Sequence, residues 1–152
     1  MALDSDTMNE LVNTVGRFVR ERLRPLEEQV ADNDAIPVEI RQEIANLGLF
    51  GLTIPEEYGG LGLNMEEEVR IALELGKTSP AFRSLIGTNN GIGSLGLILD
   101  GTEEQKQRYL ARLATGELIS SFALTEPEAG SGAASVRTTA KHTENGYVIN
   151  GT

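Results

Sequence analysis

The sequence lacks several residues on which large classes of protein depend. It contains no cysteine and no tryptophan, and 5% of its 152 residues are aromatic. Without cysteine there is no disulfide framework, no thiolate zinc site and no cysteine nucleophile. Lys and Arg are also scarce, since 13 of them stand against 23 Asp and Glu, for a formal net charge of −10 at pH 7. Binding to a nucleic acid or to an anionic membrane depends on clustered cations, so we expect neither as a partner.

Long apolar runs are absent as well. The sequence has no stretch of about 18 apolar residues, and its acidic N-terminus over residues 1–6 lacks the basic and apolar regions of a signal peptide. We therefore expect a cytoplasmic protein that begins at its true start. The remaining composition, 39% apolar and 24% charged, is that of an ordinary soluble globular protein, and the length suits one domain or one and a part.

Apolar residues recur at helical spacing over most of the chain. We expect five helical segments, over residues 4–30, 36–48, 64–77, 79–99 and 102–114. Capping boxes are predicted for Thr7 with Glu10, Asn64 with Glu67, and Thr102 with Gln105. Pro25 should bend the first segment without ending it, because the apolar stripe continues beyond it. The residues predicted to face inward are Met8, Leu11, Val12, Val15, Val19, Leu23, Leu26 and Val30 in the first segment, and Val38, Ile44 and Leu47 in the second.

The fourth helical segment is rich in glycine, with Gly87, Gly91, Gly93 and Gly96. Glycine lowers the stability of a helix unless another backbone must approach closely. The segment is therefore either a buried helix or one that lines a ligand.

The pattern changes from helical to strand-like after Gly116. Residues 118–124 alternate in polarity, and residues 135–142 and 147–150 are also typical of strands, with Glu144-Asn145-Gly146 supplying the positive φ angles of a tight hairpin turn. Two or three strands do not form a stable sheet alone in water, so the sequence looks cut inside a second domain. We expect a mainly α chain, with an N-terminal helical domain of about five helices over residues 1–116 and the first strands of a β domain over residues 117–152.

A loop of small residues follows the first predicted strand. Gly130 and Gly132 would let backbone amides approach an anionic group closely, and Thr125 and Ser131 supply hydroxyls. Loops at strand ends commonly hold ligands. An ordinary turn between strands explains the same residues, so the pattern alone leaves both interpretations open.

Three segments of the sequence resemble the acyl-CoA dehydrogenase family. Residues 123–131, Ala-Leu-Thr-Glu-Pro-Glu-Ala-Gly-Ser, resemble its flavin-contacting signature. Residues 54–62 look like the loop after its second helix, and residues 101–106 look like the opening of its fifth. The resemblance implies a helical N-terminal domain followed by a β domain. It also implies FAD bound between the β domain and a C-terminal helical bundle, which is absent from this chain.

The resemblance assigns residues to the cofactor. It implies that FAD is lined by Phe122, Ala123, Leu124, Thr125, Glu126, Pro127, Glu128, Ala129, Gly130 and Ser131. Leu124 and Thr125 would lie beside the isoalloxazine ring, and Thr125 is the best candidate for stabilising the reduced flavin, because a fixed donor favours the added electron density. The family has Asp where this chain has Gly132. This departure predicts a looser loop and weaker or less ordered cofactor binding.

A second set of residues is assigned to the substrate. Phe82-Arg83-Ser84 resembles the Tyr-Arg-Ser of glutaryl-CoA dehydrogenase. The resemblance implies that Arg83 and Ser84 bind the distal carboxylate of a dicarboxylyl-CoA, for which the planar fork of Arg is suited. Otherwise Arg83 is a solvated residue in the first turn of a helix. Ser131 is the third candidate, near the CoA thioester arm or pyrophosphate.

The family's catalytic base is a Glu on the C-terminal bundle, and no residue of this chain matches it. The loop carboxylates Glu56, Glu57, Glu126 and Glu128 are interpreted as exposed and solvated, as are Glu27, Glu28 and residues 66–68 on the helices. No metal site is indicated. We therefore expect no catalytic residue in this chain and no dehydrogenase activity from it alone.

The function implied by the resemblance is part of a flavoprotein oxidoreductase of fatty acid β-oxidation. The intact enzyme would convert an acyl-CoA thioester to the 2,3-enoyl-CoA and pass electrons to an electron-transferring flavoprotein. It would be a homo-oligomer when full length, since the family usually forms tetramers. The alternative is a non-catalytic helical interaction module that keeps the flavin loop as inherited structure.

Overall fold

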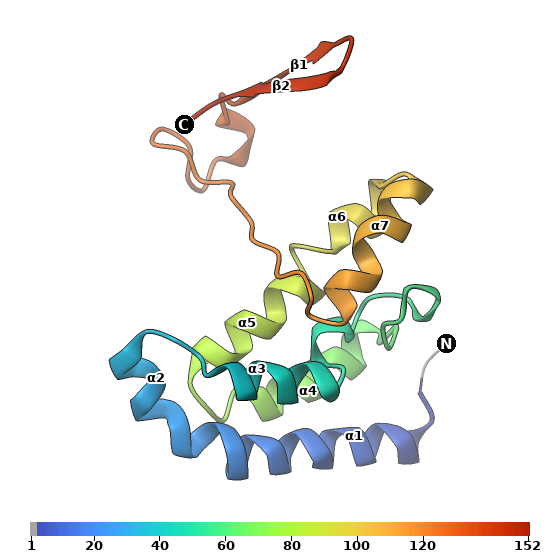
Figure 1. Ribbon diagram of the computed structural model, residues 1–152, viewed down its shortest axis with the longest axis vertical. Helices are drawn as coiled ribbons and strands as arrows, with labels where there is room; N and C mark the ends of the chain where they lie inside the picture. Colours follow the sequence, from blue (N-terminus) through green and yellow to red (C-terminus); the bar gives the residue numbers. More distant parts are fainter. Residues whose placement is uncertain (1–2) are drawn as a thin grey trace. The chain divides into compact units, whose positions relative to one another are not determined.

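The computed structural model describes residues 3–152, which form two compact units (Figure 1). The first unit ends at Ser121 and is helical, and the second begins at Phe122 and holds a two-stranded sheet. The predicted fold class, a helical domain followed by the first strands of a β region, is confirmed. Residues 117–121, expected in the second domain, belong to the helical unit, because Asn89 binds the backbone of Leu118 and Ser120.

Seven α-helices lie in the first unit, within the described residues. They are α1 (Ser5–Phe18), α2 (Glu27–Asn33), α3 (Val38–Asn46), α4 (Met65–Leu75), α5 (Pro80–Asn90), α6 (Leu95–Asp100) and α7 (Glu103–Ala114). The helix α1 packs against α4, α5 contacts α4 and α7, and α6 packs against α7. All five predicted helical segments are present, with the first and the fourth each divided in two.

The first segment bends around Pro25, as predicted. A π-helical turn at Val19–Leu23 and a 3-10 turn at Arg24–Leu26 join α1 to α2, so the chain changes direction without leaving helical geometry (Figure 1). Proline removes one hydrogen bond of the helical ladder, which explains why regular α geometry stops here. The helix α2 ends at Asp34, which has a left-handed φ of 48°.

The predicted cap at Thr7 is wrong, because Asp4 caps α1. Its carboxylate accepts the backbone N–H groups of Asp6 and Thr7, each at 3.0 Å. The Thr7 hydroxyl instead donates to Asp4 at 2.6 Å. A carboxylate at a helix N-terminus is favoured by the helix dipole as well as by these bonds. The other two predicted capping boxes are confirmed, at the starts of α4 and α7.

The fourth segment divides into α5 and α6 where the backbone passes close to residue 120. A Cβ at Gly93 would lie 1.8 Å from Oγ of Ser120 and 2.6 Å from the carbonyl oxygen of Thr88. No side chain fits in that space, so glycine is required at this position by a close approach.

The apolar stripe of the first segment forms one side of the main core, as predicted. Five of its residues are buried, and Leu11, Val12 and Leu26 pack against them while partly exposed. The inward placement predicted for Val38 is wrong, since its side chain is 77% exposed. The helix α3 begins at Val38 and buries Ile40 and Ile44 instead.

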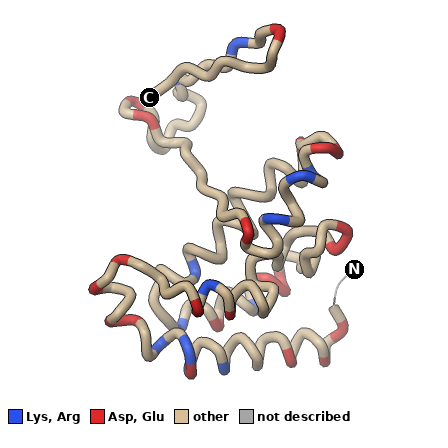
Figure 2. Tube along the Cα trace, in the orientation of Figure 1, with Lys and Arg blue, Asp and Glu red and all other residues tan. Residues whose placement is uncertain are grey.

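Two acidic residues that we expected to be solvated instead accept hydrogen bonds from other residues of the helical unit. Glu67 is buried, and its carboxylate accepts the backbone N–H of Leu3 at 2.7 Å and that of Asn64 at 2.8 Å. Glu27 accepts the hydroxyl of Thr78 at 2.7 Å and the N–H of Ser79 at 3.0 Å. Figure 2 shows the remaining acidic and basic positions interspersed along the helical unit.

The second unit contains an antiparallel hairpin of β1 (Thr139–Thr143) and β2 (Gly146–Asn150), with Thr139 opposite Asn150. The predicted hairpin is confirmed, although only Gly146 of its turn has a positive φ, at 127°. The strand predicted over residues 118–124 is wrong. Among the described residues the sheet has only two strands, and the backbone at 118 and 120 is bound to a side chain.

Candidate functional site

The segment 122–125 of the second unit presents unpaired polar groups beside exposed apolar side chains. Phe122 is 56% exposed and Leu124 is 41% exposed. Within the described part of the chain, residues 122–125 make no hydrogen bond, so their backbone N–H groups and the Thr125 hydroxyl are free to bind another group. These residues are among those that the family resemblance assigns to the flavin.

A tight turn follows this segment. The N–H of Glu126 donates to the carbonyl of Ala129 at 3.0 Å, and the N–H of Ala129 donates back to the carbonyl of Glu126 at 3.1 Å, with Pro127 and Glu128 between them. Ala129 is buried, while Gly130 and Ser131 are exposed. The Ser131 hydroxyl also has no hydrogen-bond partner in the described residues.

The carboxylate of Glu126 does not face solvent freely, which corrects our expectation for this residue. Its oxygens accept the backbone N–H of Arg137 at 2.7 Å, the backbone N–H of Thr138 at 2.8 Å, and the Thr138 hydroxyl. The pKa of the Glu126 carboxyl lies below its usual range. The main cause is the hydrogen bond from the Thr138 hydroxyl, and the two backbone N–H bonds lower the pKa further. Glu128 is exposed and pairs with the Arg137 guanidinium.

Gly132 does not use the conformational freedom of glycine. Its φ of −90° is accessible to any residue, and the nearest atom to a Cβ there, Oγ of Ser135, lies at 3.5 Å. The backbone carbonyl of Gly132 accepts the N–H of Ser135 at 2.8 Å and begins a 3-10 turn at Ala133–Ser135. An Asp side chain would therefore fit here, and the looser loop predicted from its absence stays a prediction.

The candidate substrate residues lie on α5 in the helical unit. Arg83 and Ser84 are both exposed in the first turns of this helix. A Cβ at Gly87 would lie 2.6 Å from Nη1 of Arg83, so the missing side chain at position 87 leaves room for the guanidinium to lie along the helix. The structure thus leaves Arg83 and Ser84 accessible on one helix, and the candidate cofactor residues accessible in the second unit.

Asn89 is a buried polar residue that sequence reasoning missed. It is fully buried, and its side-chain amide donates to the carbonyls of Leu113 at 2.9 Å and Leu118 at 2.8 Å. Its oxygen accepts the backbone N–H of Ser120 at 2.8 Å and the Ser120 hydroxyl at 3.0 Å. Asn89 thereby fixes the segment that leads to Phe122. The available signal was an asparagine three positions after Ile86, on the face of α5 that the apolar residues bury, since a buried amide is kept only when it is bonded.

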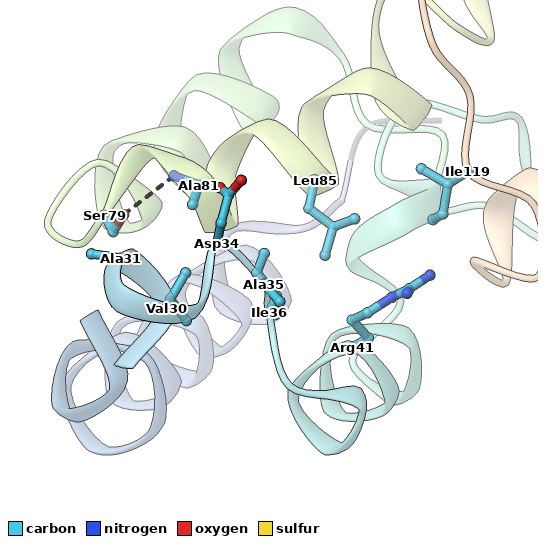
Figure 3. A pocket seen from close by; sticks show the side chains of 10 residues that line it. All are labelled: Val30, Ala31, Asp34, Ala35, Ile36, Arg41, Ser79, Ala81, Leu85 and Ile119. Carbon is cyan, nitrogen blue, oxygen red and sulfur yellow. Dashed lines mark hydrogen bonds between the residues drawn. The ribbon is translucent and has the colours of Figure 1, made fainter. Parts of the chain in front are cut away.

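A groove of about 580 Å³ crosses the helical unit beside the N-terminal half of α5 (Figure 3). Its walls are mainly apolar and include Val30, Ile36, Leu85 and Ile119, with Arg41 at one end. None of the residues predicted to bind cofactor or substrate lines it. Among the described residues there is no group of acidic, His or Cys side chains that could hold a metal, and no helix long and apolar enough to span a membrane.

A helical domain that leads through an exposed loop with free donors into a β hairpin is the arrangement that the family resemblance implies. Comparison with known proteins identifies the family. The family model for the acyl-CoA dehydrogenase N-terminal domain matches residues 5–117. The chain therefore belongs to the acyl-CoA dehydrogenase family.

Individual relatives agree with this assignment. The chain is 34% identical over 151 residues to the mitochondrial isovaleryl-CoA dehydrogenase of Solanum tuberosum, covering 98% of this chain and 37% of that protein. A crystal structure of an acyl-CoA dehydrogenase from Bacillus anthracis complexed with FAD superposes with a TM-score of 0.86 at 38% identity, covering 97% of this chain and 26% of that one.

A crystal structure of a glutaryl-CoA dehydrogenase from Mycobacterium smegmatis in complex with FADH2 superposes with a TM-score of 0.87 at 34% identity. That match covers 98% of this chain and 38% of the crystallised chain. The present chain thus spans about a quarter to two fifths of these three proteins.

Proposed function

We propose that this chain is the N-terminal part of an FAD-dependent enzyme that oxidises an acyl-CoA thioester to the 2,3-enoyl-CoA. The observation that carries the proposal is the segment 122–125, whose exposed apolar side chains and free donors suit a flavin, in a chain of this family. The structures of relatives with FAD and FADH2 support the choice of cofactor.

The residues that would hold FAD are Phe122, Leu124, Thr125 and Ser131. When bound, the flavin supplies the acceptor for a hydride from the β-carbon of the substrate. The Thr125 hydroxyl would donate a hydrogen bond to the edge of the ring and favour its reduced form. Glu126 is not assigned a direct contact in this proposal, because its carboxylate already accepts three hydrogen bonds from Arg137 and Thr138.

This chain supplies no base for α-proton abstraction in the proposed reaction. The carboxylates nearest to the candidate loop are Glu126, which is bonded to the backbone, and Glu128, which is exposed and paired with Arg137. Neither is a desolvated carboxylate able to remove a carbon-bound proton. We infer that the base lies in the part of the enzyme beyond this chain, and that the chain alone does not turn over acyl-CoA.

The finer features of the intact enzyme rest on the family resemblance. Arg83 and Ser84 on α5 would bind the far end of the acyl chain, and a dicarboxylyl-CoA suits an exposed guanidinium there. An electron-transferring flavoprotein would accept the electrons, a homotetramer would be the working assembly, and β-oxidation would be the metabolic setting. The cytoplasmic location expected from the sequence stays a prediction.

The test is a titration of FAD with the purified chain, followed by flavin absorption and fluorescence. Thr125→Ala removes the candidate donor, and Thr139→Ala removes an exposed hydroxyl of β1 as a matched control. Saturable binding that weakens in Thr125→Ala alone supports the proposal. Equal binding by all three proteins would show that the loop is not the flavin site.

A second candidate, a helical interaction module without cofactor, is favoured by one observation. The outer face of α4 exposes Met65, Val69 and Leu73, with Met65 74% exposed and Leu73 65% exposed. An apolar stripe of this kind is typical of a surface that packs on another protein. Self-association of the chain, measured by sedimentation, together with no FAD binding would favour the module over the enzyme.

A further inference from the structure

The segment that resembles the family's flavin-contacting signature contains Glu126, whose carboxylate accepts hydrogen bonds from other residues of this chain. Glu126 receives three hydrogen bonds, two from the backbone N–H groups of Arg137 and Thr138 and one from the Thr138 hydroxyl. The two partners lie 11 and 12 residues farther along the chain, where it approaches β1. Each carboxylate oxygen is engaged by at least one donor.

These bonds close a loop whose middle has little to hold it. Within the described residues, Gly130 and Ser131 make no hydrogen bond. The turn 126–129 lies on one side of them and the 3-10 turn Ala133–Ser135 on the other. Two local turns joined by Gly and Ser have many relative arrangements, and a carboxylate that binds both ends of the loop removes most of them.

Glu128 provides a contrast within the same turn. It carries the same charge two residues away, yet it is exposed and contacts only the exposed guanidinium of Arg137. A solvated ion pair of this kind contributes little to structure. A carboxylate that accepts backbone N–H groups in a fixed geometry contributes more, because charge-assisted bonds are the stronger ones.

We propose that Glu126 is a positioning residue for the flavin, which ties the chain before β1 to the turn 126–129 and so holds Thr125 and Ser131 in one arrangement. The inference rests on the proposed function, since it takes the loop to be the flavin site. In this proposal Glu126 acts on the flavin through Thr125 and Ser131, in place of the direct cofactor contact that the family resemblance implies for it.

The test compares Glu126→Gln with Glu144→Gln, an exposed carboxylate in the turn between β1 and β2, in this chain for amide exchange and in the full-length enzyme for FAD binding. In Glu126→Gln the amide side chain keeps the shape of the carboxylate and one acceptor oxygen, but its NH2 group faces an N–H donor of Arg137 or Thr138, so at least one of these bonds is lost. Two quantities are measured, the exchange rates of the Arg137 and Thr138 amide hydrogens by NMR, and the Kd for FAD with the spectrum of the bound flavin. Thr138→Val, which removes only the hydroxyl bond, serves as a milder variant.

For Glu126→Gln we expect about tenfold faster exchange of the two amides, about tenfold weaker FAD binding and an altered flavin spectrum. For Thr138→Val we expect about a threefold loss of affinity, and for Glu144→Gln a change within about twofold. The far-UV circular dichroism of the helical unit should stay the same in all variants.

The possible failures are distinguishable. Unchanged amide exchange in Glu126→Gln would show that the carboxylate does not hold the loop. Faster exchange with unchanged FAD affinity and spectrum would show that the bonds are structural only. No FAD binding by the full-length wild-type enzyme, with both amides protected in this chain, would overturn the flavin role together with the proposed function, while the bonds themselves would be verified.

Discussion

Replacing Asn89 by alanine should be among the most damaging single substitutions in the helical unit. The change removes four hydrogen bonds at a fully buried side chain and leaves the carbonyl of Leu118 and the N–H of Ser120 without their partner, while the carbonyl of Leu113 keeps its bond from the N–H of Gly116. A net loss of about 1 kcal/mol for each bond, together with the cavity, gives about 3–5 kcal/mol. That is a large fraction of the roughly 5–15 kcal/mol by which a domain is stable.

The assay is urea unfolding followed by circular dichroism at the helical band. With a slope of about 1–3 kcal/mol per molar urea, the midpoint should fall by about 2 M. Asn13→Ala is the matched control, because Asn13 is exposed on α1 and its replacement should change stability by no more than about 0.5 kcal/mol. A loss below about 1 kcal/mol in Asn89→Ala would refute the reasoning, since it would mean that the four bonds do not form.

Three further substitutions or conditions test the loop and the substrate residues. Gly132→Asp should tighten FAD binding by up to about fivefold, because the backbone at this position accepts any residue and an Asp can cap nearby amides. Isothermal titration measures the Kd for FAD, and weaker binding by the variant would contradict this prediction. Arg83→Ala in the full-length enzyme should raise KM for dicarboxylyl-CoA substrates about tenfold or more while leaving monocarboxylyl substrates unchanged, as steady-state kinetics would show. The lowered pKa of Glu126 means that its bonds stabilise the second unit above the ordinary pKa of a glutamate and are lost as the pH falls through the lowered value. The Thr138 amide should therefore lose its protection from hydrogen exchange only at acid pH, and Glu126→Gln should abolish that step.

Local signals in the sequence predicted the helices well. The capping boxes at Asn64 and Thr102 depend on residues three positions apart, so the sequence contains all the information that they require. The same holds for the apolar stripe of α1 and α2. The cap at Thr7 was wrong because Asp4 offers a carboxylate three positions earlier and the helix begins there, so the amides that Thr7 would cap are bonded within the helix.

Long-range contacts explain what local patterns did not predict. Residues 118–124 alternate like a strand, but the partner of residues 118 and 120 is the side chain of Asn89, about thirty positions earlier. Glu67 was expected in water, yet it binds the N–H of Leu3, 64 positions away. In the candidate site, the family resemblance located the loop, while the bonds of Glu126 to Arg137 and Thr138 became visible only in the folded chain.

The measurement that tests the central claim most directly is an NMR titration of the isotopically labelled chain with FAD. If residues 122–125 and 130–131 form the flavin site, their amide signals should shift in a saturable manner, and those of Thr125 and Ser131 should shift most. Shifts confined to the helical groove lined by Leu85 and Ile119 would contradict the account.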